Sequence, residues 1–262
     1  MGNWTAVTKR ILQKWHGAGN DFLIDVIGAH AASPWGSTSA QAVCDRVTGI
    51  GADGLLVAID SGTLVEMTLF NADGSIAEMS GNGIRCLAAA VLRVRDREQA
   101  SLEVMTGAGN RVVEISLQGD AGYGTVGMGE VIACNNDLEG ILAMVNVGNP
   151  HVVVRDDSSW TDEVREVLAA RWAEQAGGAN VEFLSGGASD ISIRVIERGV
   201  GWTLACGTGS VAAAFVSRSL GESTNDVIVH NPGGDLRVSF TADFATLGGP
   251  VAFVSNYEWS IA

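Results

Sequence analysis

The chain has few basic residues. Its 262 residues include 16 Lys and Arg against 30 Asp and Glu, which gives a formal net charge of −14. Such a field repels nucleic acid and anionic membranes, so we expect neither as a partner. Small anions are not excluded, because backbone dipoles at a helix start attract them locally against the net charge.

Cysteine and histidine are also scarce, with four of each. Neither set has the spacing of a metal site, and we expect no metal. The chain shows no secretory signal and no apolar run of membrane-spanning length, which predicts a cytoplasmic protein with reduced thiols. These residues are Cys44, Cys86, Cys134, Cys206, His16, His30, His151 and His230.

Hydrophobic residues, by contrast, make up 47% of the chain. That is enough to bury a core in one large domain or in two domains of ordinary size. The 34 glycines punctuate short segments, as is typical of a strand-rich protein with tight turns.

Two stretches of the chain are versions of each other. Residues 78–91 read EMSGNGIRCLAAAV, and residues 204–215 read LACGTGSVAAAF. Each places a small reactive residue, Ser80 or Cys206, before Gly-x-Gly and continues into an Ala-rich segment. The two lie about half a chain apart, which predicts two similar domains facing each other, with one reactive side chain from each.

Periodicity predicts many short strands and a few helices. Helices 82–94 and 208–220 are apolar on almost every side, so each must be buried all round, and we expect a sheet curled around each. The expected helices are 39–47, 82–94, 161–173 and 208–220. The expected strands are two within 11–27, then 55–59, 64–70, 102–105, 111–117, 123–132, 141–147, 151–155, 181–184, 191–196, 227–229, 236–240 and 251–254.

The segment Cys206–Gly209 combines a thiol with a glycine-rich helix start. Free backbone N–H groups there favour a carboxylate by about 0.3–2 kcal/mol and stabilise a thiolate. A buried structural cysteine beside a turn is the alternative, and the second copy of the segment argues against it. The glycines fit a dinucleotide-binding fingerprint only weakly, since no clear β-α-β unit surrounds them.

Other polar residues indicate little when taken singly. His151 lies between two apolar strands, where histidine is commonly structural, and a Glu197–Arg198 pair is typical of a solvated turn. Asparagine at a strand–turn junction commonly serves the turn itself. Asn20, Asn71 and Asn180 lie at such junctions.

Together these segments resemble the diaminopimelate epimerase family of cofactor-independent amino-acid epimerases. The resemblance covers nearly the whole chain, and its motifs occur in the family's order. They are KWHGAGNDF at 14–22, FNADGS at 70–75, SGNGIRC at 80–86, GNPH at 148–151, NVEF at 180–183, ERG at 197–199 and CGTG at 206–209.

The resemblance implies an α/β (α+β) fold of two pseudo-symmetric domains, each a curled mixed β-sheet around a central helix. Residues 9–120, with a returning C-terminal segment, would form one domain and residues 121–250 the other. It also implies interconversion of LL- and meso-2,6-diaminopimelate, a step toward lysine and peptidoglycan, by two-base proton transfer at Cα. It implies no pyridoxal phosphate or other cofactor, and a homodimer.

The resemblance further implies the site residues. The general acid/base pair is Ser80 and Cys206, tuned by His151 and Glu197. The residues implied for the substrate carboxylate are Gly81, Asn82, Gly207 and Thr208. Those implied for the distal amino-acid end are Asn20, Asn71, Asn149, Asn180, Glu197 and Arg198.

Position 80 departs from the family, which normally has cysteine there. A thiol has a pKa near 8.5 and an aliphatic hydroxyl one nearer that of water, a difference of about 10 kcal/mol in forming the anion. Protein environments shift a pKa by about 3–5 units at most, so Ser80 is expected to donate a proton better than it accepts one. Cys86 lies about 9 Å further along the helix and is expected in the core.

Three alternatives stay open. One is another racemase of this fold, for histidine, proline or hydroxyproline, although Asn149, Asn180 and Arg198 argue against proline, which has no distal carboxylate. Another is a catalytically impaired substrate-binding homologue, in which Ser80 marks lost chemistry. The third is that Ser80 was introduced by engineering.

Overall fold

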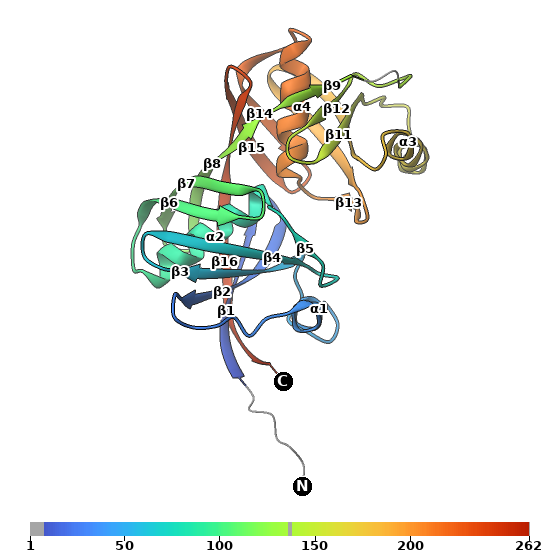
Figure 1. The fold of residues 1–262 in the computed structure, drawn as a ribbon. Coiled ribbons are helices and arrows are strands. Elements are labelled where there is room, and N and C mark those ends of the chain that lie inside the picture. Colours follow the sequence, from blue (N-terminus) through green and yellow to red (C-terminus); the bar gives the residue numbers. More distant parts are fainter. Residues whose placement is uncertain (1–7, 136–137, 262) are drawn as a thin grey trace. The chain divides into compact units, whose positions relative to one another are not determined.

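The computed structural model describes residues 8–135 and 138–261. It divides into two compact units, coloured along the chain in Figure 1. Unit 2 is the continuous segment Thr125–Gly249, and unit 1 combines the chain before it with the segment from Pro250 onward. Strands β8 (Ala121–Glu130) and β16 (Phe244–Ile261) each begin in one unit and end in the other.

Unit 1 contains a mixed sheet in the order β1-β2-β3-β4-β6-β7, with the second half of β16 paired to β1. The parallel neighbours are β2 with β3 and β4 with β6, and the other pairs are antiparallel. The short β5 pairs with β4. The bounds are β1 Thr8–Gly17, β2 Asn20–Gly28, β3 Gly54–Asp60, β4 Leu64–Asn71, β5 Ile76–Ala77, β6 Gln99–Thr106 and β7 Gly109–Gln118.

Helix α2 (Gly81–Val94) is the centre of unit 1. It contacts β1, β2, β3, β6 and β7, and every residue from Gly81 to Leu92 is buried. In Figure 1 the strands of unit 1 lie around it. Small alanines let the strands approach, so the all-round apolar pattern is explained by a sheet curled about the helix. Helix α1 (Ser37–Cys44) packs on β3 and β4 and closes a second cluster of buried residues.

Unit 2 repeats this arrangement around helix α4 (Gly207–Ser219), which contacts β10, β11, β12, β14 and β15. Its strand order is β16-β15-β14-β12-β11-β10-β9. Helix α3 (Asp162–Gln175) covers β12 through an aromatic cluster of Trp160, Trp172 and Phe183. The bounds are β9 Ile132–Cys134, β10 Ala143–Asn146, β11 Pro150–Arg155, β12 Asn180–Glu197, β13 Gly201–Thr203, β14 Ser223–Asn231 and β15 Gly234–Thr241.

The expected fold class is confirmed, and most expected elements lie within a few residues of their predicted bounds. The prediction of two separate strands at 181–184 and 191–196 is wrong. They form one strand, β12, whose first half pairs with β11 and whose second half pairs with β14. Gly186 and Ala188 adopt positive φ and the register shifts after Ala188, so a local irregularity lies inside one continuous strand. The short strands β5, β9 and β13 were not predicted.

Among the described residues, no helix is long and apolar enough to cross a membrane.

Candidate active site

Ser80 caps the first helix start, where α2 begins. Its backbone is extended, and its Oγ accepts a hydrogen bond from the N–H of Gly83 at 3.0 Å. The N–H groups of Gly81 and Asn82 lie in the first turn, where the helix supplies no acceptor for them. This end of α2 therefore offers backbone donors and a half-buried hydroxyl to an anion.

Below this turn lies a buried arginine. Arg85 is 0% exposed, and its guanidinium donates to the carbonyl of Gly81 and to Oδ1 of Asn82, both at 2.7 Å. Burial lowers the pKa of Arg85 to about 10, which leaves it charged at neutral pH. We expected no role for this residue, although its charge in the apolar first half of the expected helix and its place in the motif SGNGIRC were signals in the sequence.

Cys206 caps the second helix start in the same way. Its backbone is extended, and its Sγ accepts from the N–H of Gly209 at 3.3 Å and lies 3.5 Å from Oγ1 of Thr208. The thiol is buried, whereas Ser80 is only half-buried. The two starts therefore share backbone geometry and differ in their surroundings.

The surroundings of Cys206 raise its pKa well above that of a free thiol. Burial is the largest cause, followed by the negative charges of Glu197 and Glu182. Thr208 and the N–H of Gly209 oppose the rise only in part. The prediction of a stabilised thiolate is therefore wrong in sign, because two carboxylates and desolvation outweigh the helix start.

His151 is held by a carboxylate that we did not predict. Its Nδ1 lies 2.6 Å from Oε1 of Glu182, and both side chains are 0% exposed. Its Nε2 lies 2.9 Å from Oδ1 of Asn149, so both ring nitrogens face an oxygen. Oε2 of Glu182 is buried without a hydrogen-bond partner. The signal for Glu182 was a carboxylate flanked by apolar residues in a predicted strand.

Glu197 lies in the same cluster. Burial raises its pKa above the usual carboxyl range, and the charge of Glu182 raises it further. Thr203, His151 and Cys206 act in the opposite direction. Within unit 2, Glu182 and His151 thus act on the protonation of Glu197, and both carboxylates act on that of Cys206.

The remaining predicted residues of unit 2 lie at the ends of neighbouring strands. Asn180 pairs in register with His151 across the parallel strands β11 and β12. The buried Oδ1 of Asn180 accepts from the backbone N–H of Arg198 at 2.9 Å, which fixes the turn after β12. The Arg198 side chain is exposed and donates to the carbonyl of Gly178 at 3.3 Å.

In unit 1, Asn20 belongs to a charged network. Its Nδ2 donates to Asp53 at 2.7 Å, and Asp53 and Asp21 both pair with Arg46. The amide oxygen of Asn20 is thereby turned away from Asp53. At the same edge of the sheet, Gly54 pairs with Asn71, whose Nδ2 donates to the hydroxyl of Ser75 at 2.9 Å.

The predicted residues divide between the two units. Unit 1 holds Ser80, Gly81, Asn82, Asn20 and Asn71, and unit 2 holds Cys206, Gly207, Thr208, His151, Asn149, Asn180, Glu197 and Arg198.

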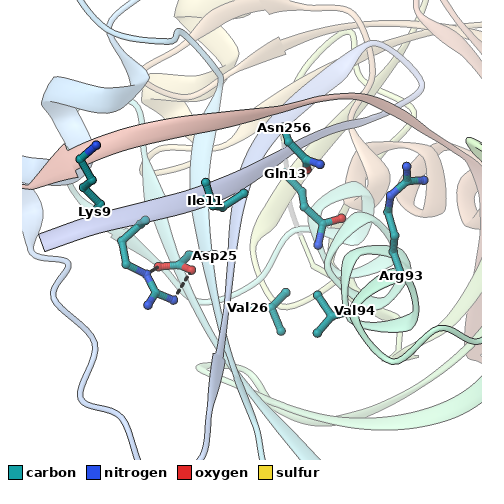
Figure 2. Close-up of a pocket in the computed structure, with 9 residues that line it drawn as sticks. Lys9, Ile11, Gln13, Asp25, Val26, Arg93, Val94 and Asn256 are labelled. Atoms are coloured by element: carbon teal, nitrogen blue, oxygen red, sulfur yellow. Dashed lines mark hydrogen bonds and ion pairs between the residues drawn. The ribbon is translucent and has the colours of Figure 1, made fainter.

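A cavity of about 480 Å³ in unit 1 is a separate feature. It is lined by residues of β1, β2, the end of α2 and β16, and includes none of the predicted site residues. Figure 2 shows Asp25 with dashed interactions there, and its partner is Arg10, at 2.6 Å between Nη2 and Oδ1. Over the ranges 8–135 and 138–261, no cluster of His, Cys, Asp or Glu could hold a metal ion.

Solved structures share this fold at low sequence identity. One, described as a predicted epimerase from Pseudomonas aeruginosa, is 13% identical with a TM-score of 0.75, covering 95% of this chain and 99% of that one. A hydroxyproline epimerase from Agrobacterium vitis is 12% identical with a TM-score of 0.67, covering 97% and 93%. The chain therefore has the fold that these two structures share.

Sequence comparison is more specific. The family model for diaminopimelate epimerase matches residues 12–133 and 143–254. Diaminopimelate epimerases from Mycobacteroides abscessus and Methanocella arvoryzae are both 36% identical, over 94% and 96% of this chain and 95% and 97% of theirs. The chain belongs to the diaminopimelate epimerase family and is an isomerase.

Proposed function

We propose that this protein interconverts LL- and meso-2,6-diaminopimelate by proton transfer at Cα, without a cofactor. The observation that carries the proposal is the pair of helix starts, each capped by a side chain able to exchange a proton. Family membership supports the substrate, a small amino acid.

The substrate contacts follow from where each helix and strand ends. The α-carboxylate binds the backbone N–H groups that begin α2 and α4, where the helix dipoles favour negative charge. The distal amino-acid end is bound by polar side chains at the strand ends. The carboxylate contacts are Gly81, Asn82, Gly207 and Thr208, and the distal contacts are Asn20, Asn71, Asn149, Asn180, Glu197 and Arg198.

The raised pKa of Cys206 determines how the thiol works. To remove the α-proton, Cys206 must first give up its own proton, and Glu197, whose pKa is also raised, is the acceptor. The transfer leaves the charge of the cluster unchanged, and it removes the carboxylate charge that opposed the thiolate. Ser80 then delivers a proton to the opposite face of Cα, and solvent returns one to its oxygen.

The decisive experiment is to incubate LL-diaminopimelate with the protein in deuterated water and to separate the products by chiral chromatography. We expect meso-diaminopimelate carrying deuterium at Cα, and faster exchange from the diastereomer whose hydrogen faces Cys206. Ser80→Cys should raise turnover, because a thiol is the better acid and base. Absence of exchange with both proteins would refute the proposed activity.

The capping bond of Ser80 favours one other function, a substrate-binding homologue that does not turn over. In that case Ser80 serves only the helix, and the protein would bind diaminopimelate in calorimetry without exchanging its α-hydrogen. Ser80→Cys would then gain activity from none.

The proposal extends to a cytoplasmic homodimer that binds neither nucleic acid nor membrane. The net charge of −14 supports the lack of affinity for polyanions. Light scattering of the purified protein measures its molar mass in solution, and we expect that of a dimer.

A further inference from the structure

Arg85 is a buried cation without a carboxylate partner among the residues that the structure describes. Its side chain makes two hydrogen bonds, both to neutral groups of its own helix, and its Nε is buried with no partner. An uncompensated buried charge is costly to keep, and a methionine or leucine would fill this volume more cheaply.

The fold makes room for this side chain. A Cβ atom at Gly124 would lie 3.2 Å from Cγ of Arg85, and one at Gly17 would lie 3.5 Å from its Nη2. Strands β8 and β1 thus each place a glycine beside the arginine, one at its aliphatic stem and the other at its guanidinium. The titratable groups whose charges act on it are Cys86 of the same helix and Tyr123 of β8.

The guanidinium contacts the turn that carries the site. It donates to the carbonyl of Gly81, the residue after Ser80, and to the side chain of Asn82. Both bonds reach back toward the helix start, so they fix the orientation of the first turn. They also add a full positive charge to the end of the helix that already attracts anions.

The second helix start has the opposite charge. Arg85 is the fifth residue after Ser80, and the fifth residue after Cys206 is Val211, which is fully buried. In place of a cation, this start has the carboxylates of Glu182 and Glu197. Local charge therefore favours an anion at the serine and a neutral group at the cysteine.

We propose that Arg85 is a positioning residue that orients the Gly81–Asn82 turn and makes the Ser80 end of α2 electropositive, which lowers the proton affinity of the side chain at position 80. The proposal rests on the proposed epimerase function, because only proton transfer by Ser80 gives a use to an electropositive helix start. Opposite charges at the two starts bring the proton affinities of the hydroxyl and the thiol closer together.

A titratable probe tests the potential directly. In the Ser80→Cys protein, the rate of iodoacetamide alkylation is followed against pH, with each cysteine resolved by peptide mass spectrometry. We expect the introduced thiol to have its alkylation midpoint below that of Cys206 in the same molecule. The reverse order would overturn the proposal, and neither result requires turnover or a change at Arg85.

A second variant isolates the arginine. Adding Arg85→Gln to Ser80→Cys should raise the midpoint of the introduced thiol by about one pH unit and slow its alkylation at pH 7 about tenfold. Arg85→Lys keeps the charge and should keep most of the lower midpoint. Arg93→Gln removes a charge from the exposed end of the same helix and should leave the midpoint unchanged.

If Arg85 has only a structural role, the result is different. Arg85→Gln would then lower the unfolding temperature and leave the midpoint in place, which contradicts the proposal. Since alkylation is measured without substrate, failure of the epimerase assay and failure of this inference are separate outcomes.

Discussion

At the scale of single residues, Ser80 and Cys206 have equivalent backbones and opposite surroundings. Both cap a helix through the N–H three residues on, at 3.0 and 3.3 Å. The hydroxyl has a buried guanidinium behind it, and the thiol has two carboxylates beside it. Repetition of a motif therefore sets the direction of a side chain, while its neighbours set its proton affinity.

A substitution at Gly209 probes these neighbours. An added Cβ would lie 2.7 Å from Oε1 of Glu182, which is bonded to His151, so the carboxylate must move. We expect Gly209→Ala to lower kcat strongly and to destabilise the fold by about 1–3 kcal/mol. Chiral chromatography and thermal unfolding measure the two effects.

Gly127→Ala is the matched control, because a Cβ there meets nothing within 4 Å. It should leave both quantities unchanged. Wild-type kcat in Gly209→Ala would show that the position of Glu182 does not matter.

At the scale of elements, the helices are buried by strands on several sides, and their ends are tied to those strands. The last turn of α2 is joined to β3, where Nε of Arg95 donates to Asp60 at 2.9 Å. The Arg95 pair, more than any other contact, lowers the pKa of Asp60. The ion pair therefore connects the central helix to the sheet that surrounds it.

This pair gives stability a defined pH dependence. Because the folded pKa of Asp60 is lowered, its contribution is present above the unfolded value of about 3.9 and is lost as the pH falls through the folded pKa. We expect Asp60→Asn to cost about 1–2 kcal/mol at pH 7, and less toward pH 3. Urea unfolding at several pH values measures the difference.

Glu258→Gln supplies the comparison, since Glu258 and Lys9 form an exposed pair, 55% and 66% accessible. Its effect should be about 0–1 kcal/mol. A cost for Asp60→Asn that grew as the pH fell would contradict the assignment.

At the scale of the whole molecule, unit 1 is built from both ends of the chain. The second half of β16 pairs with β1 from Thr8 to His16, and Phe253 packs on Trp15 with ring centroids 5.3 Å apart. Ile261 joins the buried cluster around α1. Unit 1 therefore depends on residues that follow all of unit 2.

Deletion from Pro250 onward should consequently unfold unit 1 selectively. We expect the amides of α2 to lose their protection from hydrogen exchange, while those of α4 keep theirs. Hydrogen exchange followed by mass spectrometry resolves the two helices. Phe244→Ser changes an exposed side chain at the other end of β16 and should spare both. Equal loss of protection in α2 and α4 would mean that the units unfold together.

The sequence by itself determined most of the elements, the fold class and the family. Periodicity and glycine turns are local signals, and two all-apolar helices require enclosing sheets wherever they lie. Tertiary structure decided what is not local. It joined strands 181–184 and 191–196 into β12, placed Glu182 against His151 and buried Arg85 behind Ser80. It also reversed the expected shift at Cys206, because desolvation and neighbouring charges depend on residues brought together only by folding.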